Sequence, residues 1–156
     1  NSMKIGVVKE LPAVKDGTLS FIPWNDRFIM GGNGIPYGNP LRGYDDNRVG
    51  PLTSTGSPIG GNMMVKFGTE FRVPFAENPV VYGLIFAEMG NVWSSTDLME
   101  RLSLPRSGPF DMKRSAGAGI RFFMPMIGML GFDIGYGFDR FPEPGWKTTL
   151  TFGNQF

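Results

Sequence analysis

The sequence predicts an all-β fold: an antiparallel, up-and-down β-sheet of about six strands, as in a transmembrane β-barrel, together with one long loop. Three observations lead to this prediction. Several long segments alternate apolar and polar residues, which is the two-residue period of a β-strand. The polar face of these segments consists of Gly, Thr and isolated charges. No segment reaches the roughly 18 consecutive apolar residues that a membrane-spanning helix needs.

Six segments carry the strand period, and they are, in chain order, 4–9, 62–73, 80–93, 115–123, 130–138 and 147–156. The first is short and is followed by Pro12, which favours the end of a strand. The second alternates strictly over about twelve residues, roughly twice the common strand length of about six. In the last three, bulky residues such as Ile120, Phe132 and Leu150 alternate with Gly, Thr or a single charged residue. Helical content is expected to be close to nil.

Between the first two strands lies a Gly- and Pro-rich segment, 11–61, without a lasting helical or strand period. So long a connection inside a single domain is uncommon, and it usually has a function.

Composition excludes several classes of protein. The chain has 156 residues, a one-domain length, and its 23 Gly and 13 Pro follow no Gly-X-Y period, so it is not collagen. The 14 Phe are too many for a disordered chain. The absence of Cys and His excludes disulfide scaffolds, thiolate or imidazole metal sites and His-dependent nucleophilic catalysis. A net charge of +1 gives no electrostatic reason to expect nucleic-acid binding. We therefore expect no catalytic residue, no metal and no cofactor.

The small polar face distinguishes two kinds of β-protein. In a soluble β-sandwich, the outward face would carry many Lys and Glu residues. Here the polar face is small, as if it lined a lumen, and the apolar face is rich in aromatic residues. Strands of about ten residues with this alternation are typical of transmembrane barrels. A soluble, lectin-like β-domain with a binding role stays open as the alternative.

Several motifs occur in the same order as in a known family. Leu41-Arg42-Gly43-Tyr44 resembles the (V/L)-R-G-(F/Y) loop motif of the Omp85 superfamily. Residues 28–32 resemble its F-x-x-G-G lead-in, and residues 86–93 resemble its F-x-D-x-G-x-V-W strand. The segments 49–51, 60–62, 115–121 and 124–130 also match family patterns, and the chain ends on Phe as the C-terminal β-signal does. The resemblance covers residues 3–156 and is closest in kind to the BamA-type insertases.

The resemblance implies a fold and a function. Residues 1–156 would be the C-terminal portion of an Omp85-type barrel, a transmembrane β-barrel fragment of about six strands. Segment 11–61 would be its long lumen loop, and residues 1–2 are interpreted as a cloning remnant. The implied function is non-enzymatic: part of an outer-membrane assembly factor, in the bacterial outer membrane, that folds and inserts other β-barrels. The alternative within the superfamily is a two-partner-secretion export pore. The implied partners are outer-membrane lipid, unfolded β-barrel substrates and accessory assembly lipoproteins.

The same resemblance assigns roles to individual residues. Arg42 would fold into the lumen and pair with Glu70 and Glu88, the second of which stands where the family usually has Asp. An Arg fork in a confined site makes bidentate bonds to carboxylates. The alternative interpretation is an exposed loop Arg.

The last strand would carry the C-terminal recognition signal, which comprises Leu150, Phe152, Gly153 and Phe156. An ordinary final strand with an aromatic residue at the membrane interface is the alternative.

The alternation also predicts which way side chains point. The apolar set should face away from the lumen: Met63, Val65, Phe67, Phe71, Ile120, Phe132, Ile134, Leu150 and Phe152. The charged set should face into it: Lys66, Glu70, Arg72, Glu88, Arg121 and Asp133. Because six strands leave two unpaired edges, we also expect copies of this chain to pair edge to edge as a homo-oligomer.

Overall fold

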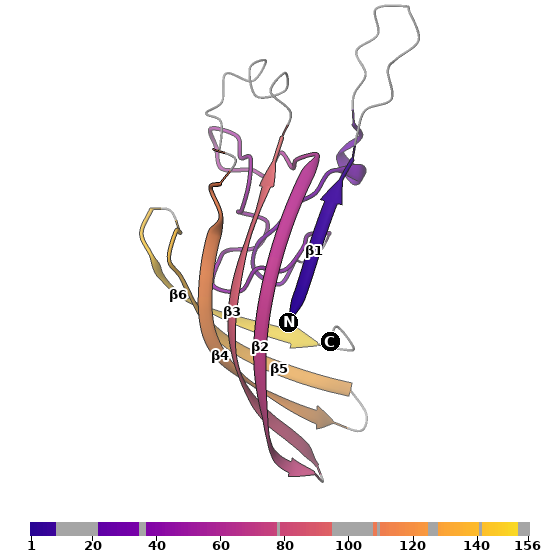
Figure 1. Ribbon diagram of the computed structural model, residues 1–156, viewed down its shortest axis with the longest axis vertical. Helices are drawn as coiled ribbons and strands as arrows, with labels where there is room; N and C mark the ends of the chain where they lie inside the picture. Colours follow the sequence, from indigo (N-terminus) through magenta and orange to yellow (C-terminus); the bar gives the residue numbers. More distant parts are fainter. Residues whose placement is uncertain are drawn as a thin grey trace, which may run out of the picture.

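The computed structural model describes residues 1–8, 22–34, 37–77, 79–94, 108, 110–124, 128–140 and 142–152. Six strands form one antiparallel sheet in which each strand pairs with the next along the chain (Figure 1). The strands are β1 (Ser2–Val7), β2 (Met63–Glu77), β3 (Val80–Trp93), β4 (Lys113–Met124), β5 (Gly128–Gly137) and β6 (Gly145–Phe152). The ladder runs from β1 to β6 and is not closed, so the predicted six-stranded, up-and-down barrel fragment is confirmed.

The strands differ from the predicted segments mainly at their ends. β2 continues to Glu77, beyond the predicted end at Val73, and includes Pro74, which lacks an N–H for the ladder. The structure accommodates this residue with a shift of register between Pro74 and Ala76, which is a bulge. β1 begins at Ser2 and ends at Val7, two residues before the predicted end.

Within the described residues of the expected loop there is one short 3-10 helix, η1 (Trp24–Asp26), which the sequence did not indicate. No helix in the described ranges is long and apolar enough to cross a membrane.

The strand register places the predicted residues on the predicted faces. On the convex face, Phe71 is 63% exposed and Leu150 is 54% exposed, and the other apolar residues of that set also point outward wherever their side chains are described. On the concave face, Lys66, Glu88, Arg121 and Asp133 are buried. Glu70 and Arg72 lie on this face too, where all six side chains border one cavity. A sandwich would need two packed sheets, whereas the described strands form one.

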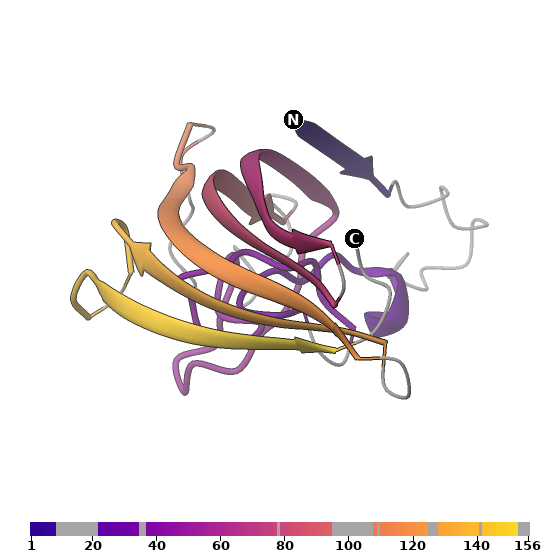
Figure 2. The ribbon, with the colours of Figure 1, turned by 90° about the horizontal axis from the view of Figure 1, so that it is seen from below.

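The part of the loop formed by residues 22–34 and 37–62 lies on the concave side of the sheet, where Figure 2 shows it in purple within the curve of the strands. Isolated bridges hold it together, among them Met30 with Val49 and Gly32 with Leu41. The core joins the segment to the sheet, because Met30, Leu41, Tyr44 and Val49 pack with residues of β2 and β3. Met30 and Leu41 are completely buried. The part of the predicted lumen loop that the structure describes, residues 22–34 and 37–61, is therefore a layer packed against the sheet.

Candidate functional site

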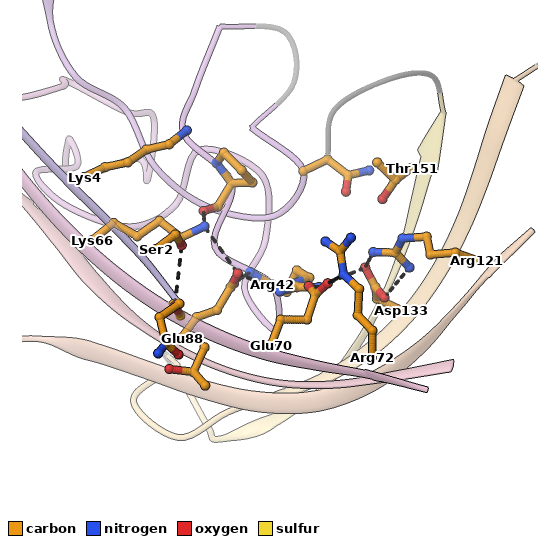
Figure 3. Close-up of a pocket in the computed structure, with 15 residues that line it drawn as sticks. Ser2, Lys4, Arg42, Lys66, Glu70, Arg72, Glu88, Arg121, Asp133 and Thr151 are labelled. Atoms are coloured by element: carbon orange, nitrogen blue, oxygen red, sulfur yellow. Dashed lines mark hydrogen bonds and ion pairs between the residues drawn. The ribbon is translucent and has the colours of Figure 1, made fainter. Parts of the chain in front are cut away.

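Arg42 lies at the centre of a charge cluster on the concave face (Figure 3). Its Nη2 donates to Oε1 of Glu88 at 2.8 Å, and its main-chain N–H donates to Oε2 of the same carboxylate at 3.0 Å. Its Nη1 lies 3.1 Å from Oε2 of Glu70 and 3.6 Å from Oδ2 of Asp133. The guanidinium also lies 3.7 Å from the centre of the Phe86 ring, within cation–π range. Both sheet carboxylates that the sequence predicted as partners thus contact Arg42.

The three carboxylates stabilise the charge of Arg42, whose side chain is largely buried. Burial by itself lowers the pKa of the guanidinium, because a low-dielectric site disfavours the charged form. The hydrogen-bonded Glu88 carboxylate, followed by Asp133 and Glu70, outweighs burial, and the pKa of Arg42 is raised above its usual value. The loop is therefore tied to β2, β3 and β5 through one permanent positive charge.

Further basic side chains complete the cluster from the sheet. Lys66 Nζ lies 3.3 Å from Oε1 of Glu88 and also donates to the main-chain oxygen of Pro40 in the loop. Arg121 makes a two-bonded fork with Asp133, at 2.6 and 2.7 Å, and the two side chains are only 3% and 1% exposed. Because Asp133 contacts both Arg121 and Arg42, it links the sheet's own ion pair to the loop.

The loop backbone touches the sheet backbone beside Arg42. Gly43 has φ +88°, a conformation that favours glycine. A Cβ on Gly43 would lie 3.1 Å from the main-chain N of Gly137 and the Cβ of Ser115. In the opposite direction, a Cβ on Gly135 would lie 2.9 Å from the main-chain N of Gly43. Glycine on both surfaces therefore allows the motif to lie flat on β4 and β5.

Tyr44 fixes the far end of the motif. Its hydroxyl donates to the main-chain oxygen of Arg114 at 2.7 Å and accepts from the main-chain N–H of Asp139 at 3.3 Å. Burial raises the pKa of Tyr44 to about 12, so the hydroxyl keeps the proton it donates. An aromatic residue without the hydroxyl would fill the same space but lose both bonds.

The loop also contacts the last strand. The side-chain amide of Asn33 donates to the main-chain oxygen of Leu150 in β6, and Nζ of Lys147 in β6 pairs with the Asp45 carboxylate. Arg140, in the β5–β6 connection, lies 3.4 Å from the same carboxylate. The hydrogen bond from Lys147 lowers the pKa of Asp45. One loop thus holds both the central strands and the edge strand.

A cavity of about 460 Å³ lies next to the cluster. It is bordered by loop residues such as Asn33 and Pro40, by the charged cluster, and by Lys4 of β1 and Thr151 of β6. The charged side chains that border it are largely paired with one another, which suits a role in holding the loop. In the part of the chain that the structure describes, no group of three or more His, Cys, Asp or Glu residues is placed to hold a metal.

The first testable prediction concerns the glycine contact. Gly43→Ala introduces a Cβ at 3.1 Å from sheet backbone, which cannot rotate away as a side chain can. Gly128→Ala is the matched control, because Gly128 also has a positive φ, +91°, but its Cβ would meet nothing within 4 Å. We expect Gly43→Ala to cost about 1–3 kcal/mol more than Gly128→Ala, the typical cost of overpacking.

The measurement is urea unfolding of the folded, full-length protein in detergent, with both variants compared with the wild type. Equal midpoints for the two variants would show that the loop backbone does not rest on the sheet.

The structure brings together most, but not all, of the residues that the sequence singled out. Leu41 lies in the core, and Leu150 faces outward from β6. The main chain of Phe152 ends β6, and its side chain is not among the described ones. Gly153 and Phe156 lie outside the described residues, so the C-terminal signal stays a prediction.

Sequence reasoning missed the link through Asp133, although the alternation had placed Asp133 and Arg121 on the same face. The signal that could have predicted this link is the glycine opposite each charged residue: Gly131 pairs with Arg121, and Gly119 pairs with Asp133. A bulky charged residue that faces glycine on the next strand has room to reach diagonally to another charge. The role of Asn33 left no such signal in the sequence.

The sequence profile of the Omp85 superfamily domain matches residues 5–154, nearly the whole chain. No curated protein matches the chain. Members of this superfamily are outer-membrane proteins of bacteria or organelles. The match includes the loop motif, the strands that hold it and all of β6, which agrees with the geometry described above. The chain belongs to the Omp85 superfamily.

Proposed function

We propose that this chain is part of an outer-membrane assembly factor of the BamA type, which folds and inserts other β-barrel proteins into a bacterial outer membrane. Its role is non-enzymatic. Its partners are the lipid of that membrane, unfolded β-barrel substrates and the accessory assembly lipoproteins of the parent complex.

The observation that carries the proposal is the double attachment of the loop. Arg42 is bound by carboxylates on β2, β3 and β5, while Asn33 and Asp45 contact β6 at the edge of the sheet. An edge strand offers unpaired N–H and C=O groups to which an incoming strand can add. The loop contacts β6 from the concave side and so fixes the position of this edge. Such an arrangement suits an insertase in which a substrate strand is added beside β6.

The alternative within the superfamily is an export pore, which would use the same loop to occupy a channel. The contact between the loop and β6 favours the insertase. An export pore requires a movable plug, but it requires no contact between that plug and the strand edge to which a substrate strand would add. Pairing between copies of this chain through the free edges of β1 and β6 also stays a prediction.

A cross-linking experiment in the full-length protein tests the proposal. This chain contains no Cys, so a single introduced Cys within it is the only one there. Thr148→Cys places a thiol on β6, and a matched Thr69→Cys places one on β2, an interior strand, with both side chains exposed on the same face. A substrate barrel carries one Cys in its terminal strand. Paired strands bring Cα atoms to about 5.5 Å, which a disulfide can bridge.

We expect disulfide formation with Thr148→Cys during substrate folding into vesicles, and none with Thr69→Cys. Substrate folding without any cross-link at position 148, or with equal cross-linking at both positions, would contradict the addition of a substrate strand beside β6. Release of a secreted passenger across the vesicle membrane, in place of barrel folding, would support the export pore instead.

A further inference from the structure

The convex face of the sheet carries a groove that the loop and the charge cluster do not explain. It has a volume of about 380 Å³ and crosses β2, β3 and β4. Its floor is a row of three small side chains, because Thr69 pairs with Ala87 and Ala87 pairs with Ala116. On an otherwise bulky apolar face, this row leaves a hollow.

Larger side chains border the groove. On one side Phe67 pairs with Met89, and Met89 pairs with Arg114, with Phe138 lying beside Arg114. Phe67, Met89 and Phe138 are 37%, 42% and 48% exposed, so they stand up from the surface as a wall. The groove is therefore an apolar channel with a guanidinium in one wall.

Arg114 is the one basic side chain on the convex face of the described strands, since the other Lys and Arg residues there point to the concave side. Its Nε and Nη2 bond the two oxygens of Asp139 at 3.0 and 2.9 Å. A guanidinium has five N–H donors, and the side chain stays 62% exposed. Arg114 can therefore bind a further anion without losing Asp139.

The position of Arg114 along the strands suits a membrane interface. It lies at the end of the sheet where the connections are long, residues 94–112 and 138–144, whereas the β2–β3 and β4–β5 connections at the other end are two and three residues. Long connections of transmembrane barrels lie outside the membrane. The guanidinium is then at the level of lipid headgroups, and the apolar floor extends toward the hydrocarbon.

We propose that this groove binds one acyl chain of an anionic membrane lipid and that Arg114 holds the phosphate of its headgroup. The inference rests on the membrane location given under Proposed function, but not on the insertase activity. Charge complementarity selects this occupant: an apolar groove beside a guanidinium that is 62% exposed fits an anionic amphiphile. A protein partner would need a contact area near 1,600 Å², far more than this groove provides.

Native mass spectrometry of the full-length protein in non-ionic detergent tests the inference. The probes are phosphatidylglycerol and phosphatidylcholine with identical acyl chains. The wild type is expected to retain one phosphatidylglycerol in preference to phosphatidylcholine. Arg114→Gln is expected to weaken phosphatidylglycerol binding about tenfold, the effect of losing a charged hydrogen bond, and to abolish the preference.

A second pair of variants separates the groove from lipid bound anywhere on the convex face. Ala116→Leu fills the floor and is expected to abolish the retained lipid. Ala118→Leu is the matched control, since it lies on the same strand and face, two residues further on and outside the groove.

Equal lipid retention in the wild type and Ala116→Leu, or equal losses with Ala116→Leu and Ala118→Leu, would overturn the inference. So would an unchanged headgroup preference in Arg114→Gln, or a dimer mass in place of a lipid adduct, which would identify a second copy as the occupant. Substrate folding, measured separately, shows whether the proposed function fails independently of this site.

Discussion

Arg42→Ala in the full-length protein is expected to lower the rate of substrate folding at least tenfold, while the six strands stay folded. The substitution removes one charge that three carboxylates share, at 2.8, 3.1 and 3.6 Å. Breaking a buried ion pair by removing one partner typically costs about 3–5 kcal/mol. Because a cavity borders this cluster, we expect about 3 kcal/mol, and each 1.4 kcal/mol is worth a factor of ten in the population of the docked loop.

Two variants separate the charge cluster from a general effect of losing a basic residue. Arg42→Lys should restore only part of the activity, because an ammonium cannot bond Glu88 and Glu70 with two separate nitrogens. Arg48→Ala is the control within the same loop, since Arg48 is exposed and lies outside the cluster. Hydrogen exchange of residues 37–50 reports loop docking directly. Full activity of Arg42→Ala, or exchange no faster than in Arg48→Ala, would show that the cluster does not hold the loop.

The faces of the sheet could be predicted from the sequence because the side-chain period of a strand is two. Once Phe71 and Leu150 were taken as outward, Glu70 and Thr149 had to point inward, and a slip of one residue would have inverted each strand. The partners of Arg42 required more than periodicity. They followed from the resemblance to the family motif, and the structure places both glutamates within bonding distance.

The contacts between the loop and the last two strands could not be predicted in the same way. They depend on the curvature of the sheet, which brings β5 and β6 around to the loop (Figure 2). Strand alternation fixes which face Gly135 and Asp133 occupy, but it does not fix how far the sheet bends. The hydrogen bond from Asn33 to Leu150 shows this most clearly, because the two residues are 117 positions apart in the sequence and only the bend of the sheet brings them together.

The curvature also explains why glycine surrounds Asp133 on the concave face of β5. Gly135 and Gly137 lie on the side where the loop passes, and a Cβ on Gly137 would lie 2.5 Å from the main-chain oxygen of Gly43. Small residues on that face have two consequences at once: they admit the loop backbone, and they leave room for the diagonal fork between Arg121 and Asp133. A lumen lined by larger side chains would have neither.

Asp133→Asn is expected to be the most destabilising of these substitutions. The amide keeps the size of the side chain but removes the charge that faces both Arg121 and Arg42. Because Asp133 and Arg121 are 1% and 3% exposed, water cannot replace the lost partner. The expected cost is about 3–5 kcal/mol of unfolding free energy, the range for breaking a buried pair from one side.

Asp139→Asn provides the matched control, because Asp139 forms the same two-bonded fork with Arg114 at 2.9 and 3.0 Å. Arg114 is 62% exposed, so water solvates its guanidinium when the carboxylate is lost, and we expect little change in stability. Urea unfolding of the full-length protein in detergent compares the two variants. If both unfold at the same urea concentration, burial does not strengthen the Arg121–Asp133 pair, and the concave face around Arg42 is open to water.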